Sequence, residues 1–507
     1  MMKYIQTLLF IFFAAGLFAQ DNFDTPTSRK NMKADLDMFY KMREAANSGV
    51  YKYRTKAQMD SIYQWGRAEI EQSKSIGEFY NILSKITDFE GSLHNDTELP
   101  KKIRKSILDE PSGYFPFPIK LIEGKWVCNT KASIVPLGSS IISINDKSIN
   151  ELIPELYRYY TTDGYNITGK QIGINKNFPL YYRMRFGRRE SFEIKYKTKE
   201  EDVRKVTVKG ISYEEAKKRF QDRHSKDSDS LLYTPPYELI KNKDVYHSQI
   251  INDSIAIFTV NTFVIGSDAE DPSHKAYIKY LDSVFTEFNV KFIRHLIVDV
   301  RYNGGGNDPN DLVTYSYLTN RNFQENIEAW IPFRKIPYWS RIKGELPFWQ
   351  KPIAKLIFQR QLKNDFVSEK KGKYYQDGSS NDHKVWRPNP NAFKGKIYLL
   401  ISPRVASAGS MFASMLASDS TTITVGEETQ GGYYGHNGHT AIRYQLKYSK
   451  IKTSWFIVNL KQDVRTKESQ PFGYGILPHY RVEQSYSDFL DNEDTAMKFL
   501  KNLIQEK

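Results

Sequence analysis

The chain has 507 residues, a length that predicts about two to four domains around a large core. Apolar residues make up 40% and aromatic residues 14%, which is enough buried surface to exclude a disordered protein. The net charge is +14, but Lys and Arg are interleaved with 59 acidic residues and no nucleic-acid recognition motif accompanies them, which argues against a nucleic-acid-binding protein.

The first twenty residues have the pattern of a secretory signal peptide. Lys3 precedes an apolar run over 8–15, and small and apolar residues continue to Ala19 and Gln20. The run is shorter than the roughly 20 residues that a bilayer-spanning helix needs. We therefore expect residues 1–20 to be a signal peptide, and the mature protein to be periplasmic or secreted with no transmembrane segment.

Residues 21–105 are predicted to form a helical region. Thr55 with Gln58, and Ser75 with Glu78, have the spacing of capping boxes. Apolar residues then recur at helical spacing up to Ile86, so we expect an amphipathic helix that ends near Asp88. The loop over 89–96 follows this helix. It should therefore lie near the surface on which the apolar face of the helix packs.

Residues 106–225 have the texture of a separate β-rich module, with a strand over 141–144 and a hairpin around 192–196. The stretch over 136–149 resembles a PDZ domain, which implies a module that recruits extended peptides. The alternative is a β-sandwich spacer. A polar stretch over 224–230 is predicted to be a linker.

Residues 226–507 are predicted to form an α/β core. Apolar strands are expected over 255–260, 295–300, 397–401 and 422–425, and helical patterns alternate with them. The segment over 320–392, rich in Trp, Arg and Pro, is predicted to be an insertion that forms a lobe over the site.

Two segments of this core indicate catalytic chemistry. Three glycines, Gly304 to Gly306, follow a buried strand, and their backbone amides can approach a ligand and stabilise an oxyanion. A tight turn is the alternative, whereas a nucleotide loop would need Lys and Ser or Thr after the glycines. Ser407 lies at the start of a predicted helix, where the dipole favours an anionic intermediate. A capping serine is the alternative there.

Together the motifs over 299–306, 402–413, 425–432 and 472–479 resemble the C-terminal processing (tail-specific) serine peptidases, in particular their tricorn-core-like branch, with His479 in place of the usual acid. The resemblance implies a Clp protease/crotonase-like core, a peptide or protein substrate and no cofactor. It assigns Ser407 as the nucleophile, and the amides of Gly305 and Ala408 as the oxyanion hole.

The resemblance also bears on the general base. Tail-specific members use a lysine 25 residues after the serine, where this chain has Gly432. The tricorn-like branch instead uses a histidine that precedes the PDZ-like module, and His94 occupies the matching place. His436 and His439 are alternative bases.

Glu468 is the first candidate for the acid that orients the base, ahead of Glu427 and Glu428. No metal site is predicted, because His436 and His439 lack the helix and glutamate of a zinc-peptidase motif. Two non-enzymatic alternatives remain: a catalytically inactive protein of the same fold that binds peptides or hydrophobic ligands, and a PDZ adaptor.

Overall fold

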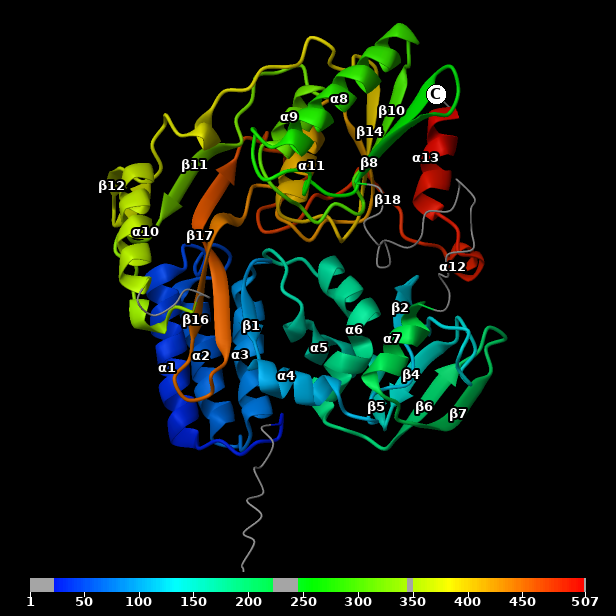
Figure 1. The fold of residues 1–507 in the computed structure, drawn as a ribbon. Helices are drawn as coiled ribbons and strands as arrows, with labels where there is room; N and C mark the ends of the chain where they lie inside the picture. The colour runs from blue at the N-terminus through cyan, green and yellow to red at the C-terminus, as the bar shows by residue number, and fades with distance from the viewer. Residues whose placement is uncertain (1–21, 222–244, 344–349, 506–507) are drawn as a thin grey trace, which may run out of the picture.

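A computed structural model describes residues 22–221, 245–343 and 350–505, which form three β-sheets with their covering helices (Figure 1). The predicted signal peptide, and the predicted linker over 224–230, lie outside these residues. The upper half of the view in Figure 1 holds the α/β core. The lower half holds the N-terminal helices on one side and the β-rich module on the other.

The core sheet has the order β18-β15-β14-β10-β9-β8. Its strands are β8 (Tyr246–Ile250), β9 (Ile255–Val260), β10 (His295–Asp299), β14 (Lys396–Ile401), β15 (Ile423–Gly426) and β18 (Tyr480–Arg481). All neighbours are parallel except β8, which is antiparallel to β9. The four strands predicted from their apolar runs are confirmed, because parallel strands buried on both faces need such runs.

Helices cover both faces of the core sheet. On one face lie α8 (Pro272–Val290), α9 (Asn310–Ser316) and α11 (Ala408–Ser418), whose apolar side chains share one cluster with those of β9, β10 and β14. On the other face α13 (Thr495–Gln505) contributes Leu500 and Ile504. The core is thus a three-layer α/β arrangement, in agreement with the predicted fold class.

The N-terminal region consists of α1 (Arg29–Ala46), α2 (Lys56–Ile70), α3 (Ile76–Glu90) and α4 (Lys101–Leu108), with the short strand β1 (Asp96–Glu98). Both predicted capping boxes are formed, at the starts of α2 and α3. Helix α3 ends at Glu90, two residues beyond the predicted end, because Gly91 adopts the left-handed conformation (φ 74°) that terminates helices.

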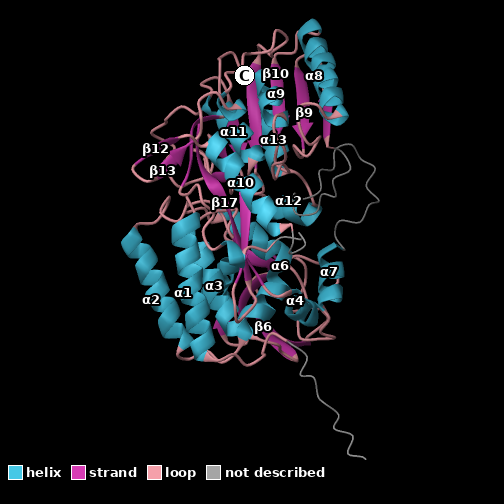
Figure 2. Ribbon diagram, turned by 60° about the vertical axis from the view of Figure 1, so that its left-hand side comes forward, coloured by secondary structure: helices cyan, strands magenta, loops and turns pink. Residues whose placement is uncertain are grey.

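A second sheet joins this region to the core. Its order is β1-β17-β11-β13-β12, and β16 also pairs with β17, from Lys452 to Asn459. The strands are β11 (Asn326–Ile331), β12 (Ser368–Lys370), β13 (Lys373–Tyr375), β16 (Asn437–Gln445) and β17 (Lys452–Gln462). Strand β17 pairs with β1 near its start and with β11 near its end, and Figure 2 shows it running beside α1–α3.

The predicted insertion over 320–392 contains β11, α10 (Lys351–Asp365), β12 and β13. Side chains of β11 and α10, among them Ile331 and Leu362, belong to the same apolar cluster as α1–α3. The insertion therefore shares a β-sheet with β1 and an apolar core with the N-terminal helices.

The β-rich module is an antiparallel sheet in the order β2-β3-β4-β6-β7, with β5 beside β4. Its strands are β2 (Ile119–Ile122), β3 (Lys125–Cys128), β4 (Ser140–Ile144), β5 (Lys147–Ser148), β6 (Ser191–Lys197) and β7 (Val203–Lys209). Its helices are α5 (Ile149–Leu156), α6 (Thr168–Phe186) and α7 (Tyr213–Gln221). The predicted strand and hairpin are present as β4 and β6–β7, while the PDZ-like assignment stays a prediction.

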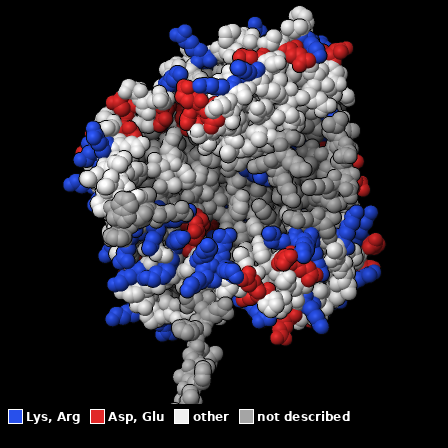
Figure 3. Space-filling model, viewed as in Figure 1, with Lys and Arg blue, Asp and Glu red and all other residues white. Residues whose placement is uncertain are grey.

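The surface carries both signs of charge. Figure 3 shows more Lys and Arg on the lower half of this face, over the N-terminal helices and the β-rich module, with Asp and Glu among them. Within the ranges described, none of the helices combines the length and hydropathy needed to cross a bilayer.

Candidate active site

Ser407 directly precedes α11, at the carboxyl edge of the core sheet. Its φ of 50° and ψ of −134° are uncommon for a residue with a side chain, and such conformations concentrate at functional sites. The hydroxyl does not cap the helix that follows it. The alternative of a capping serine is therefore not supported, and the hydroxyl is available for another partner.

That partner is the imidazole of His94, whose Nε2 lies 3.2 Å from Ser407 Oγ. The other ring nitrogen, Nδ1, lies 2.6 Å from the backbone oxygen of Asn437. Because a carbonyl oxygen only accepts, Nδ1 must carry the proton in the neutral ring. Nε2 is then the acceptor for the Ser407 hydroxyl, which is the arrangement that a general base needs.

The surroundings of His94 favour its neutral form. The ring packs against Phe456 and His436, with centroid separations of 4.3 Å and 5.0 Å. Burial lowers the pKa of His94 to about 4, although the Asn437 carbonyl acts in the opposite direction, and the charge of His439 lowers it further. At neutral pH this imidazole is ready to accept a proton, but it is a weak base.

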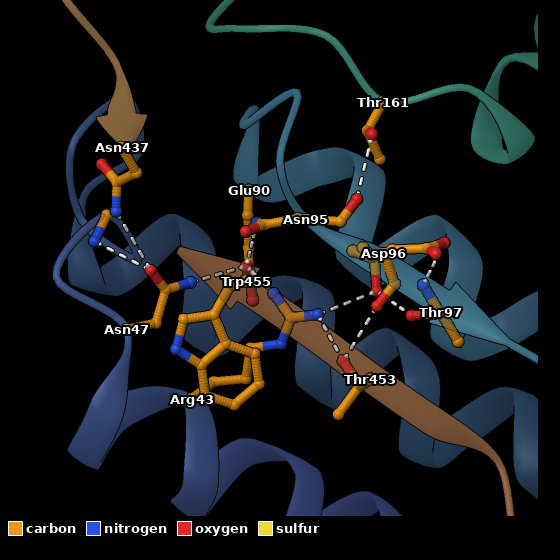
Figure 4. Close-up of polar contacts among 12 residues, drawn as sticks. Arg43, Asn47, Glu90, Asn95, Asp96, Thr97, Thr161, Asn437, Thr453 and Trp455 are labelled. Carbon is orange, nitrogen blue, oxygen red and sulfur yellow. Dashed lines mark hydrogen bonds and ion pairs between the residues drawn. The ribbon is translucent and has the colours of Figure 1, made fainter. Parts of the chain in front are cut away.

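The loop that carries His94 is tied to a buried ion pair at the end of α3 (Figure 4). The carboxylate of Glu90 lies 2.5 Å from Arg43 and also accepts hydrogen bonds from Asn47 and Asn95. Arg43 in turn donates to Thr453 of β17 at 2.7 Å. Since Asn95 follows His94 directly, this network fixes the loop relative to the second sheet.

Asp163 also holds the loop that carries His94. Its carboxylate accepts hydrogen bonds from the amide of Leu93 at 3.0 Å and from the amide of Gly432 at 2.9 Å. Burial raises the pKa of Asp163 to about 6. This residue connects the histidine loop with the segment after β15, and no sequence motif marked it for this function.

Gly305 lies against the nucleophile. With φ of 107° it occupies a conformation reserved for glycine, and a Cβ atom there would be 2.7 Å from the Cβ of Ser407 and 3.1 Å from the amide nitrogen of Ala408. Its own N–H donates to the side chain of Asn303 at 2.9 Å. The Ala408 N–H, as the first of helix α11, has no acceptor within the helix and is the better-placed donor for an oxyanion.

The site combines a serine hydroxyl, an imidazole that can accept its proton, and backbone amides at the start of a helix. These are the groups expected from the resemblance of the sequence motifs to serine peptidases. Residues 254–482 match the profile of peptidase family S41. This match includes Gly305 and Ser407 and covers somewhat less than half of the chain. On this match the chain is a serine-type peptidase, and the search of curated proteins found no match.

Solved structures share the fold of this chain. Mature CPAF complexed with lactacystin superimposes with a TM-score of 0.61 at 13% identity, covering 94% of this chain and 97% of that one. Mature CPAF alone gives a TM-score of 0.57 at 13% identity, with coverages of 94% and 96%. At this identity the likeness establishes the fold.

The remaining candidates for the base and for the acid that orients it, His436, His439, Glu468 and Glu428, make no hydrogen bond to Ser407 within the described part of the chain. Burial, and after it the neighbouring His94, holds the pKa of His436 well below its usual value. Nε2 of His439 lies 3.3 Å from Glu325. Glu468 is exposed, and Glu428 accepts a hydrogen bond from the Gly475 amide.

Among the described residues, the positions that hydrogen-bond the His94 ring are Ser407 and Asn437, and Glu468 and Glu428 are not among them. The position expected for Glu468 is occupied by the Asn437 carbonyl, which the sequence analysis missed. The side chain of Asn437 is itself held by a hydrogen bond to Ser48 at 2.9 Å. A backbone carbonyl can come from any residue type, so no residue pattern could have indicated it.

Proposed function

We propose that the chain is an exported serine endopeptidase that cleaves unstructured or C-terminal protein segments through an acyl-enzyme on Ser407. The observation that carries the proposal is the 3.2 Å contact between His94 Nε2 and Ser407 Oγ, with Nδ1 held by a carbonyl. The match of residues 254–482 to the peptidase S41 profile supports the reaction class. The signal-peptide pattern supports export.

The proposed reaction uses only groups of this chain. His94 takes the hydroxyl proton as Ser407 attacks the scissile carbonyl, and then gives it to the leaving amine. The amides of Ala408 and Gly305 stabilise the oxyanion, the second once the Asn303 side chain releases it. Water, activated by the same imidazole, hydrolyses the acyl-enzyme. No cofactor takes part.

The β-rich module supports a peptide substrate. Strand β2 is at the edge of its sheet, and an extended peptide can add to such an edge through backbone hydrogen bonds. Helix α6 packs beside β2, so an added strand would lie between the two, as in the PDZ-like recruitment that the sequence predicts.

The test is cleavage of an unstructured protein such as casein, together with labelling by a fluorophosphonate, which acylates activated serines. We expect Ser407→Ala to abolish both, with a fall in kcat of at least about 10³-fold. Ser273→Ala, an exposed serine in the first turn of α8, is the matched control and should behave as wild type. Cleavage that persists in Ser407→Ala would refute the assignment.

A catalytically inactive peptide-binding protein is the second candidate. It is favoured by the Gly305 amide being engaged with Asn303, and by the absence of a carboxylate on His94 among the contacts of the described residues. Wild-type protein that binds casein but neither cleaves it nor takes the label would support this function instead.

A further inference from the structure

A cluster of acidic residues and a histidine lies next to the active site, among side chains to which the peptidase reaction assigns no task. Asp308, Glu325 and His439 place one ligand atom each within 4.8 Å of one another. We infer that this cluster, completed by Asp311, binds a divalent transition-metal ion of the Zn²⁺ or Mn²⁺ type.

Asp311 provides the independent observation that points to a cation. It is fully buried in the first turn of α9, and neither of its carboxylate oxygens has a hydrogen-bond partner among the residues described. Buried carboxylates are normally hydrogen-bonded or bound to a metal. Asp308 and Glu325 are the charged groups that act on Asp311, so its carboxyl group lies beside the cluster.

The cluster combines three carboxyl groups, those of Asp308, Glu325 and Asp311, with the single imidazole of His439. A divalent cation would balance the charge of the carboxylates that this one imidazole leaves unmatched.

The donor set selects the class of metal. Nε2 of His439 lies 3.3 Å from a Glu325 oxygen, and a cation bound here would take the place of the imidazole proton that this ion pair holds. An imidazole combined with carboxylates suits Zn²⁺ or Mn²⁺, whereas Ca²⁺ and Mg²⁺ prefer oxygen ligands alone. With bonds of about 2.1 Å the ligand atoms would lie roughly 3.4 Å apart. Asp308 is exposed and can move by the small amount required.

The location of the cluster gives the ion a structural consequence for the active site. Asp308 ends the glycine loop that touches Ser407, and His439 follows two residues after Asn437, which holds His94. An ion bound here would connect the loop beside the nucleophile to the strand beside the base. The ligands come from three separated segments of the chain, around Asp308 and Asp311, at Glu325 and at His439. This inference revises the expectation that no metal is bound.

The experiment measures metal content, using full-length protein stripped with EDTA. It is equilibrated with ZnCl2 or MnCl2, desalted and analysed by elemental mass spectrometry, and its melting temperature is recorded in parallel. We expect wild type to retain about one ion per chain, and to melt at least about 2 °C higher with the ion than without it.

Two isosteric variants test the ligands. Asp311→Asn and His439→Gln should each weaken binding at least about tenfold, while Asp253→Asn, an exposed aspartate in the turn between β8 and β9, should bind as wild type. In EDTA, Asp311→Asn should melt no lower than wild type, because it removes a buried carboxylate that has no partner. This separates loss of the ion from loss of the fold.

The inference is overturned if wild type retains neither Zn²⁺ nor Mn²⁺, if both variants bind as wild type does, or if CaCl2 or MgCl2 competes at equal concentration. Metal content does not depend on cleavage. A protein that binds the ion without cleaving casein would refute the proposed peptidase alone, and an active enzyme without an ion would refute the metal site alone.

Discussion

Replacement of Gly305 by alanine tests whether the glycine loop must touch the nucleophile. A Cβ at Gly305 would lie 2.7 Å from the Cβ of Ser407 and 3.1 Å from the Ala406 oxygen and the Ala408 nitrogen. The first separation is shorter than carbon atoms tolerate, and the partner atoms are a short side chain and backbone, which cannot turn aside. The φ of 107° adds strain for any residue other than glycine.

The size of the effect follows from these contacts. An alanine held in this backbone conformation would cost about 1–3 kcal/mol of strain. The loop should therefore move away from Ser407. Loss of one oxyanion donor lowers kcat by about 10²–10³-fold. We therefore expect Gly305→Ala to reduce kcat/KM on casein or an unstructured peptide by about that factor.

Gly304→Ala is the matched control in the same loop. A Cβ at Gly304 meets no atom within 4 Å, so this variant should change kcat/KM by less than about threefold. Both variants should be compared by kinetics and by thermal melting, so that activity is normalised to folded protein. A folded Gly305→Ala enzyme within about threefold of wild type would refute the role given to this loop.

Three further predictions concern the base and its support. The acid limb of kcat/KM should lie near pH 4 rather than 6.5, because burial lowers the pKa of His94 and a base acts only when unprotonated; a pH–rate profile with its limb above pH 6 would contradict this. His94→Gln should lower kcat by at least about 10²-fold, whereas His436→Gln should lower it less than tenfold, and equal losses in steady-state assays would remove the assignment of His94 as base. Glu90→Gln leaves Arg43 buried without its carboxylate and should lower the free energy of unfolding by about 3–5 kcal/mol, whereas Asp37→Asn, in an exposed ion pair, should lower it by less than about 1 kcal/mol. Denaturant titrations that give similar values for both variants would contradict the buried network.

Local patterns in the sequence determined the elements that carry the nucleophile. The apolar runs of β9, β10, β14 and β15, the capping boxes of α2 and α3, and the helix after Ser407 all depend on neighbours within a few residues, and all were predicted. Helix α6 was not, because its apolar residues do not follow one face and so give no helical period.

The tertiary structure alone decided how distant segments meet. His94 lies 313 residues from Ser407, and its loop is placed by the Glu90 network, by Asp163 and by the pairing of β1 with β17. The partner of its Nδ1 is a backbone carbonyl, which a residue of any type can supply. No sequence pattern could therefore indicate this partner, and the sequence analysis named Glu468 instead. Sequence periodicity reports which residues are buried within an element, whereas the meeting of loops is set by sheet order and by polar contacts across the core, which only the folded chain contains.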